Sequence, residues 1–160
     1  MKLSLVLLSL LLIVPSTKAY SQTVVGWLET VSILSGSEQH SIQAKIDSGA
    51  DHSSIHATNI KVFTFQDQDW VTFSTINNLV LQMPLHRYTK VKTKNHTLQT
   101  RPVVLMLLCL DGKKRTIEVN LVNRKHFSRG LLVGRSALSG FLIDPQKTDL
   151  ISPESCQNKT

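Results

Sequence analysis

The stretch 103-VVLMLLCLDGKKRTIEVNLV-122 decides the fold class of this 160-residue chain. The dipeptide Asp111-Gly112 is a strong turn signal, because glycine tolerates a positive φ and this pair is favoured in tight hairpin turns. After the turn, apolar and polar residues alternate, which indicates a strand that is buried on one face. Before the turn, residues 103–110 are apolar on both faces. The stretch therefore predicts a β-hairpin whose first arm lies deep in the protein or faces a partner subunit.

Short strands separated by turns extend this pattern over the rest of the chain, which is typical of an all-β domain. The strongest helical signal is one turn over residues 136–138, which Gly140 ends. The sequence predicts strands over residues 24–33, 41–46, 61–65, 70–74, 79–83, 103–110, 115–122, 131–133 and 141–143.

The two ends of the chain differ from this domain. Residues 1–19 combine an early lysine, an apolar run and a small residue at position 19, which is typical of a signal peptide. The run is shorter than the about 20 residues that a membrane-spanning helix needs, so an uncleaved anchor is the less favoured alternative. We therefore predict an exported protein without a stable membrane span after cleavage, with a domain over residues 20–150 and a flexible tail over residues 151–160.

The formal charge of +7 falls to +5 once Lys2 and Lys18 are removed with the signal peptide. A basic surface can favour anionic partners. However, the basic residues are scattered and no aromatic series is interleaved with them, as a protein that binds single-stranded nucleic acid would need. We predict no nucleic-acid partner. The two cysteines, Cys109 and Cys156, could pair in an exported protein, or Cys109 could be a buried free thiol.

The stretch 45-KIDSGADHSSIHA-57 carries the candidate chemistry. Asp47 ends an apolar strand and enters a turn with Ser48 and Gly49. The N–H groups of the turn and the serine hydroxyl can orient the carboxylate, and Gly49 lets another segment approach closely. Taken alone, these three residues favour a plain Asx-type turn, in which Asp47 only bonds its own backbone.

The wider context favours a catalytic turn. The stretch 46-IDSGADHSSI-55 resembles the active-site loop of retropepsins, the small aspartic peptidases that include retroviral proteases. The segment 131-LLVGRSAL-138 resembles their second signature, which packs behind that loop. Together with 26-GW-27, 70-WVTF-73 and 116-TIEVNLVNR-124, nearly the whole mature chain is similar to a bacterial retropepsin-like family often labelled ATP-dependent zinc proteases. The resemblance implies an acid-protease barrel with one short helix after the LLVGR strand, in a periplasmic or secreted bacterial protein.

The resemblance also implies roles for individual residues. Asp47 would be catalytic, supported within its loop by Ser48, Gly49 and Ala50. Gly134 and Arg135 would support the loop from behind. In retroviral enzymes the aspartate that matches Asp51 binds the substrate backbone and pairs with the arginine that matches Arg135. We therefore expect these two side chains to lie close, although the position of Asp51 is often basic in the bacterial family.

The proposed chemistry needs a second carboxylate, because an aspartic dyad shares one proton between two like-charged groups. The chain contains a single Asp-Ser/Thr-Gly triplet, at Asp47. The sequence therefore predicts a homodimer in which the two copies of Asp47 face each other across a two-fold axis and hydrolyse a peptide or protein substrate. The flap of such an enzyme would fall within residues 85–102, which contain no glycine and are basic, so acidic substrates would be favoured.

Two other functions compete with this interpretation. The first is a non-catalytic domain of the same fold that binds a peptide or an envelope component. The second is the zinc metallopeptidase of the family label, with His52 and His56 as candidate ligands. Along an extended strand these two residues would lie about 13 Å apart, whereas zinc–nitrogen bonds are about 2 Å long. The chain has no Gly-x-x-x-x-Gly-Lys-Ser/Thr phosphate loop and no His-Glu-x-x-His motif, so we predict no ATP, zinc or other cofactor.

Overall fold

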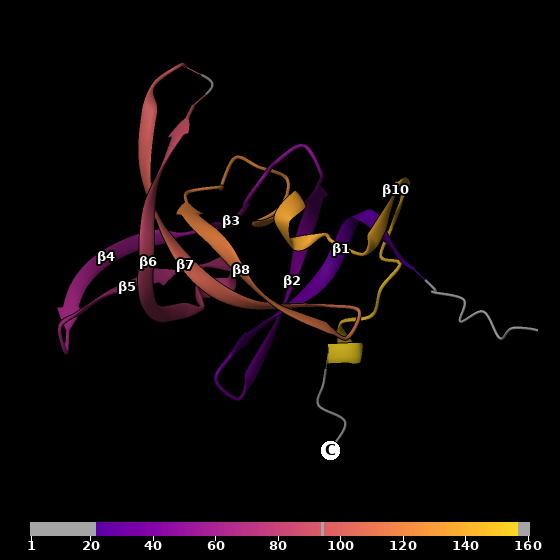
Figure 1. Cartoon of the computed structure of the whole chain (residues 1–160), viewed down its shortest axis with the longest axis horizontal. Helices are drawn as coiled ribbons and strands as arrows, with labels where there is room; N and C mark the ends of the chain where they lie inside the picture. The colour runs from indigo at the N-terminus through magenta and orange to yellow at the C-terminus, as the bar shows by residue number, and fades with distance from the viewer. Residues whose placement is uncertain (1–21, 94, 157–160) are drawn as a thin grey trace, which may run out of the picture.

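The fold of residues 22–93 and 95–156, which a computed structural model describes, is all-β, as predicted (Figure 1). Within these residues, ten strands form one sheet in the order β10-β1-β2-β9-β3-β8-β7-β6-β5-β4. The predicted signal peptide lies outside the described residues. The strands are β1 (Thr23–Ser35), β2 (Glu38–Asp47), β3 (Ser53–His56), β4 (Thr58–Phe65), β5 (Gln68–Ser74), β6 (Val80–Lys92), β7 (Leu98–Leu110), β8 (Lys113–Val122), β9 (Leu131–Gly134) and β10 (Phe141–Thr148).

Six of these strands close into a ring, because residues 32–34 of β1 also pair with residues 107–109 of β7. The ring runs β1-β2-β9-β3-β8-β7 and encloses most of the apolar core. The first arm of the predicted hairpin, which is apolar on both faces, forms part of β7. One face is buried as predicted, with Val104, Met106 and Leu108, whereas Leu105 and Leu107 are partly exposed. The parallel pairing of β2 with β9 brings Asp47 beside Gly134, which are far apart in the sequence.

Two strands run through prolines that lie beyond the predicted strand ends at residues 83 and 143. Pro84 is paired with Trp70 at the end of the β5 ladder, where β6 leaves β5 and begins to pair with β7. Pro145 lies at an irregularity in the pairing of β1 with β10, between Asp144 and Thr148. Because proline lacks an N–H group, it is tolerated where a ladder changes partner or is interrupted. The continued β6 and β7 form a long hairpin that contains the predicted flap region and projects from the ring (Figure 1).

The predicted short helix after the LLVGR strand is a 3-10 turn, η2 (Arg135–Ala137). Two further 3-10 segments were not predicted, η1 (Ile76–Asn78) and η3 (Pro153–Cys156). In the described residues, no helix has the length and apolar character needed to cross a membrane.

The flexible tail predicted from residue 151 is wrong for the segment from Ile151 to Cys156, because both of these residues are buried. Cys156 is buried and forms a disulfide with Cys109 of β7, with 5.9 Å between their Cα atoms. The backbone N–H groups of Leu150 and Ile151 donate to the carboxylate of Glu29, which is only 1% exposed. The sequence left the pairing of the two cysteines open, whereas nothing in it indicated the attachment of this segment to the buried carboxylate of Glu29. Residues 157–160 lie outside the described residues.

Candidate active site

Asp47 is the last residue of β2, and the turn that follows fixes one of its carboxylate oxygens. The N–H group of Gly49 donates to Oδ1 of Asp47 at 3.1 Å, and the N–H group of Ala50 donates to the carbonyl oxygen of Asp47 at 3.3 Å. This is the Asx-type turn considered from the sequence. The side chain is 27% exposed, so the oriented carboxylate can still be reached by a ligand.

Lys45 was not singled out from the sequence, although it contacts the candidate catalytic carboxylate. Its Nζ atom lies 3.4 Å from Oδ2 of Asp47. The spacing of two residues places both side chains on the same face of β2. That alternation was the signal that could have identified Lys45, because a lysine two positions from a strand-end aspartate faces the same side.

The second signature supports the catalytic loop through backbone contacts. The N–H group of Arg135 donates to the carbonyl oxygen of Ala50 at 2.7 Å, and the N–H group of Ser136 donates to that of Asp51 at 3.1 Å. Gly134 is needed at its position, because a Cβ atom there would lie 2.6 Å from the backbone carbonyl of His52. The loop and the segment after β9 are therefore packed together without intervening side chains.

The structure also brings Asp51 and Arg135 together, as expected from the sequence. The guanidinium of Arg135 donates to the carboxylate of Asp51. Both side chains are well exposed, so the pair contributes little to stability on its own. The pair keeps the carboxylate of Asp51 directed at Arg135.

A cavity of about 300 Å³ lies between the catalytic loop and the β6–β7 hairpin. Its walls carry three arginines, Arg87, Arg101 and Arg124, and two acidic residues, Asp51 and Glu118. Asp51 pairs with Arg135 and Glu118 pairs with Arg87. Within the described residues, Arg101 and Arg124 have no carboxylate at ion-pair distance, so these two cations set the charge of the cavity.

Neutral groups hold the two unpaired arginines in place. Nη1 of Arg101 donates to Oδ1 of Asn120 at 3.1 Å, and Nη1 of Arg124 donates to Oγ of Ser54 at 2.7 Å. Burial lowers the pKa of Arg101. Burial also lowers the pKa of Arg124, with repulsion from Arg101 as a second cause, while the charge of Asp47 acts in the opposite direction. The guanidinium of Arg124 thus lies near that of Arg101 and near Asp47, and a bound carboxylate would relieve the repulsion between the two arginines.

Glu118 of β8 links the catalytic loop to the hairpin. Its carboxylate accepts hydrogen bonds from Arg87. Nε2 of His86 lies 3.2 Å from Oε1, and Nδ1 of His52 lies 3.7 Å from Oε2. The hydrogen bond from Arg87 is the main cause that lowers the pKa of Glu118, burial opposes it, and the charges of Arg87, His52 and His86 lower the pKa further. None of these contacts was predicted, because they join segments distant in the sequence.

The lowered pKa predicts a pH-dependent effect of Glu118→Gln. The contribution of the ionised side chain should be complete above the ordinary pKa of 4.5 and should be lost as the pH falls through the lower pKa of the folded protein. Because Glu118 and Arg87 are partly exposed, we expect the substitution to lower the free energy of unfolding by about 1 kcal/mol at pH 7. Urea unfolding of both proteins at pH 7 and below pH 4 measures this. Equal differences at the two pH values would contradict the prediction. Asp67→Asn is the control, because Asp67 is exposed in the turn between β4 and β5 and has no ion pair among the described residues.

The two histidines considered as zinc ligands have other partners. Nδ1 of His56 accepts a hydrogen bond from the backbone N–H group of Arg124 at 3.0 Å, and His52 faces Glu118. In the part of the chain that the structure describes, no group of three or more His, Cys, Asp or Glu residues is arranged to hold a metal ion. His56 therefore has a structural hydrogen bond to the segment that follows β8.

Comparison with known families shows what the chain is similar to. Residues 24–154 match the family model described as "RimB-like: Retropepsin-like aspartic endopeptidase RimB". The chain is similar to the crystal structure of a protein of unknown function from Legionella pneumophila, with a TM-score of 0.67 and 32% identity over 81% of this chain and 98% of that one.

Curated relatives carry another name. Proteins named "Probable alpha-L-glutamate ligase" are 33% identical over 115 residues in Shewanella halifaxensis and 35% identical over 112 residues in Desulfotalea psychrophila. These matches cover 67% and 65% of this chain, and 25% and 24% of the relatives. The chain thus spans about a quarter of the length of the curated relatives it matches.

Proposed function

Because the chain belongs to the RimB-like family of retropepsin-like aspartic endopeptidases, we propose that it hydrolyses peptide bonds with a pair of aspartates formed by two copies of Asp47. The observation that carries the proposal is the placement of Asp47. Its carboxylate stands at the end of a core strand, is oriented by the N–H group of Gly49 and remains partly exposed. The turn itself is held from behind by Gly134 and Arg135.

In this mechanism the two carboxyl groups of the dimer share one proton. The ionised Asp47 takes a proton from a water molecule, and the oxygen of that water attacks the carbonyl carbon of the scissile bond. The protonated Asp47 of the partner donates its proton to the carbonyl oxygen. When the tetrahedral intermediate collapses, the C–N bond breaks and the first Asp47 gives its proton to the leaving amine. The partner's Asp47 takes back a proton from a hydroxyl of the intermediate, which leaves the carboxylic acid product and restores the shared proton.

Exposed apolar side chains support a homodimer. Leu105 of β7 is 45% exposed and Leu107 on the same face is also partly exposed. Leu105 lies opposite Glu118 in the β7–β8 ladder, and Glu118 lines the cavity beside the catalytic loop. An apolar surface next to an incomplete catalytic site is what a second copy would cover.

The charge of the cavity supports acidic peptides as substrates. Arg101 and Arg124 lack carboxylate partners among the described residues, and both line the cavity beside the catalytic loop. A glutamate side chain of the substrate could accept hydrogen bonds from either guanidinium. The name of the curated relatives, which refers to glutamate ligation, is consistent with a glutamate-rich substrate for this chain.

The disulfide supports the proposal that the protein is exported to the periplasm or beyond. Disulfides persist in oxidising compartments and are rare in the cytosol. The bond between Cys109 and Cys156 would form after export.

A cleavage assay combined with sedimentation tests the proposed function. The purified protein is incubated with a glutamate-rich peptide and with a glutamine-rich peptide of the same length, and the products are identified by mass spectrometry. We expect cleavage of the acidic peptide, and a specific activity that rises with protein concentration as dimers form. A protein that stays monomeric at high concentration and cleaves neither peptide would contradict the proposal, and binding of the peptide without cleavage would indicate the non-catalytic alternative.

Substrate recognition predicts a selective effect of Arg101→Gln. Because a charge-assisted hydrogen bond contributes about 1.5–3 kcal/mol, kcat/KM for the glutamate-rich peptide should fall about 10-fold to 100-fold. The value for the glutamine-rich peptide should change much less. Steady-state kinetics of both peptides measures the ratio. Arg115→Gln is the matched control, since Arg115 donates to the carbonyl oxygen of Ser139 outside this cavity. Equal losses on the two peptides would show that Arg101 does not recognise charge.

A further inference from the structure

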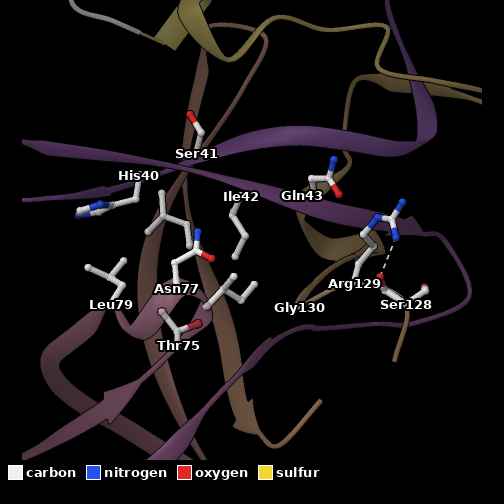
Figure 2. Close-up of a pocket in the computed structure, with 12 residues that line it drawn as sticks. His40, Ser41, Ile42, Gln43, Thr75, Asn77, Leu79, Ser128, Arg129 and Gly130 are labelled. Carbon is white, nitrogen blue, oxygen red and sulfur yellow. Dashed lines mark hydrogen bonds between the residues drawn. The ribbon is translucent and has the colours of Figure 1, made fainter. Parts of the chain in front are cut away.

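A larger cavity, of about 650 Å³, lies apart from the catalytic loop (Figure 2). It is bounded by residues 40–43 of β2, by the segment around η1 and by residues 128–130 before β9. Its lining includes no residue of the catalytic loop and neither of the two unpaired arginines beside it. Its volume falls within the range of ligand-binding pockets, about 300–1,000 Å³.

The cavity runs along an unpaired edge of β2. Four consecutive residues of the strand, 40–43, line it. Because side chains alternate between the two faces of a strand, a cavity that touches consecutive residues must follow the strand edge. One edge of β2 pairs with β1 over residues 38–45, whereas β9 pairs with the other edge only over residues 44–47. Among the described residues, the backbone groups directed to that edge before Ala44 therefore have no strand partner.

Unpartnered polar side chains face this cavity. Thr75 is only 6% exposed and its Oγ1 atom has no hydrogen-bond partner in the described structure. Nε of Arg129 is buried and also lacks a partner, while Nη1 of the same residue donates to the carbonyl oxygen of Ser128. His40 is not counted, because a carboxylate oxygen of Glu38 lies 3.2 Å from its Nε2 atom. Buried polar groups without partners are costly, and a ligand that bonds to them would remove this cost.

The cavity is apolar at one end and cationic at the other. Figure 2 shows Ile42 directed from β2 toward Asn77, with Leu79 on the other side of Asn77, while Arg129 lies beside Gln43 at the far end. No ion pair of Arg129 with a carboxylate occurs in the described part of the chain. A ligand that fits both ends has an apolar group and a carboxylate.

We propose that this cavity is a second peptide-binding site. An extended peptide adds as a strand to the free edge of β2, places a carboxylate at Arg129 and an apolar side chain against Ile42 and Leu79, and bonds to the hydroxyl of Thr75. The three residue steps from His40 to Gln43 span about 10 Å at about 3.3 Å per residue, which accommodates three to four residues of an extended chain. A peptide is favoured over other molecules that carry a carboxylate, because backbone N–H and C=O groups without a strand partner repeat along this edge of β2. The inference does not depend on the proposed hydrolysis.

Hydrogen exchange locates the bound peptide. The full protein carries Asp47→Asn, so that no cleavage occurs. The probe is an acetylated, amidated pentapeptide of threonine, valine, glutamate, valine and threonine. We expect it to slow the exchange of backbone amides within residues 39–43. A second peptide has glutamine in place of glutamate. A third is that glutamine peptide with a free carboxyl terminus, so that a terminal carboxylate is distinguished from one on a side chain.

Two variants test the contacts of the site. Arg129→Gln should weaken binding of the glutamate peptide about 10-fold to 100-fold, because it removes a charge-assisted hydrogen bond. Thr75→Val should weaken binding and at the same time stabilise the free protein, because it removes an unpartnered buried hydroxyl. Arg101→Gln, in the cavity beside Asp47, should leave the protection of residues 39–43 unchanged.

The site is supported if one of the two peptides that carry a carboxylate protects residues 39–43 and this protection is lost in Arg129→Gln. Protection by the glutamate peptide identifies a side-chain carboxylate, and protection by the peptide with a free carboxyl terminus identifies a terminal one. Absence of protection with all three peptides overturns the proposal. Recognition of a carboxylate by Arg129 is overturned if the amidated glutamine peptide protects residues 39–43 as strongly as the glutamate peptide and Arg129→Gln leaves this protection unchanged. If the peptide binds here and the unsubstituted protein cleaves neither peptide of the cleavage assay, the proposed peptidase is rejected and this site still stands.

Discussion

Asp47→Asn should abolish peptide hydrolysis, with a fall in kcat/KM of at least about 10³-fold, a loss typical of removing an acid–base group. An asparagine amide cannot accept or release the proton that the dyad exchanges with water and with the carbonyl oxygen. The fold should be unchanged, because the amide oxygen of asparagine can still accept the hydrogen bond from the N–H group of Gly49. The contact with Lys45 loses its charge pairing, which at a partly exposed site costs little stability.

Mixing experiments make this prediction specific to a shared dyad. If each active site needs one Asp47 from each copy, a dimer with one substituted copy is inactive. Addition of excess Asp47→Asn protein should then inhibit the unsubstituted protein by subunit exchange. The remaining activity should equal the fraction of dimers in which both copies are unsubstituted. Asp67→Asn is the matched control, because Asp67 is exposed in the turn between β4 and β5. Unchanged activity in the mixture would mean that one copy suffices for catalysis.

Removal of the disulfide should have the largest effect on stability. The bond between Cys109 and Cys156 closes a loop with a sequence separation of 47 residues. For a loop of this length the chain-entropy estimate is about 4 kcal/mol at 25 °C. We therefore expect the double variant Cys109→Ala/Cys156→Ala to lower the free energy of unfolding by about 2–4 kcal/mol.

Urea unfolding with and without a thiol reductant measures this effect. The unsubstituted protein should lose stability on reduction, whereas the double variant should be insensitive to the reductant. Alanine is chosen instead of serine because both positions are buried, and a serine hydroxyl there would need a hydrogen-bond partner. Equal midpoints for the oxidised and reduced unsubstituted protein would contradict the expected contribution of the bond.

Local sequence patterns predicted much of the fold. The alternation after Asp111-Gly112 identified the β7–β8 hairpin. The apolar first arm correctly indicated burial for Val104, Met106 and Leu108, whereas Leu105 and Leu107 on the other face are exposed. Membership of the retropepsin-like family, first inferred from two short motifs, is confirmed by the match over residues 24–154. The contact of Asp51 with Arg135 was also expected, because both residues belong to those motifs.

The remaining features depend on contacts between distant segments, which local patterns do not contain. The attachment of Ile151 and Cys156 follows from a buried carboxylate in β1 and from a cysteine in β7. The cavity beside the loop of Asp47 brings together Arg101 of β7 and Arg124 after β8. In the sequence, each of these two residues resembles an ordinary surface cation. A proline is disfavoured inside a strand, and the predicted strand stopped at Met83. β6 nevertheless continues through Pro84, because its pairing changes from β5 to β7 at that point.

The pairing of Ala44 with Leu131 joins residues 87 positions apart, and it determines when the catalytic turn can form. Contacts between distant parts of a chain form slowly, because a large loop must be closed before the contact stabilises it. During synthesis, the segment that contains Asp47 emerges well before β9 and the glycine that packs behind the turn. A chain whose β9 has not yet been made therefore lacks the support for its turn, and under the proposed function the site could become competent for hydrolysis only after β9 has emerged and paired with β2.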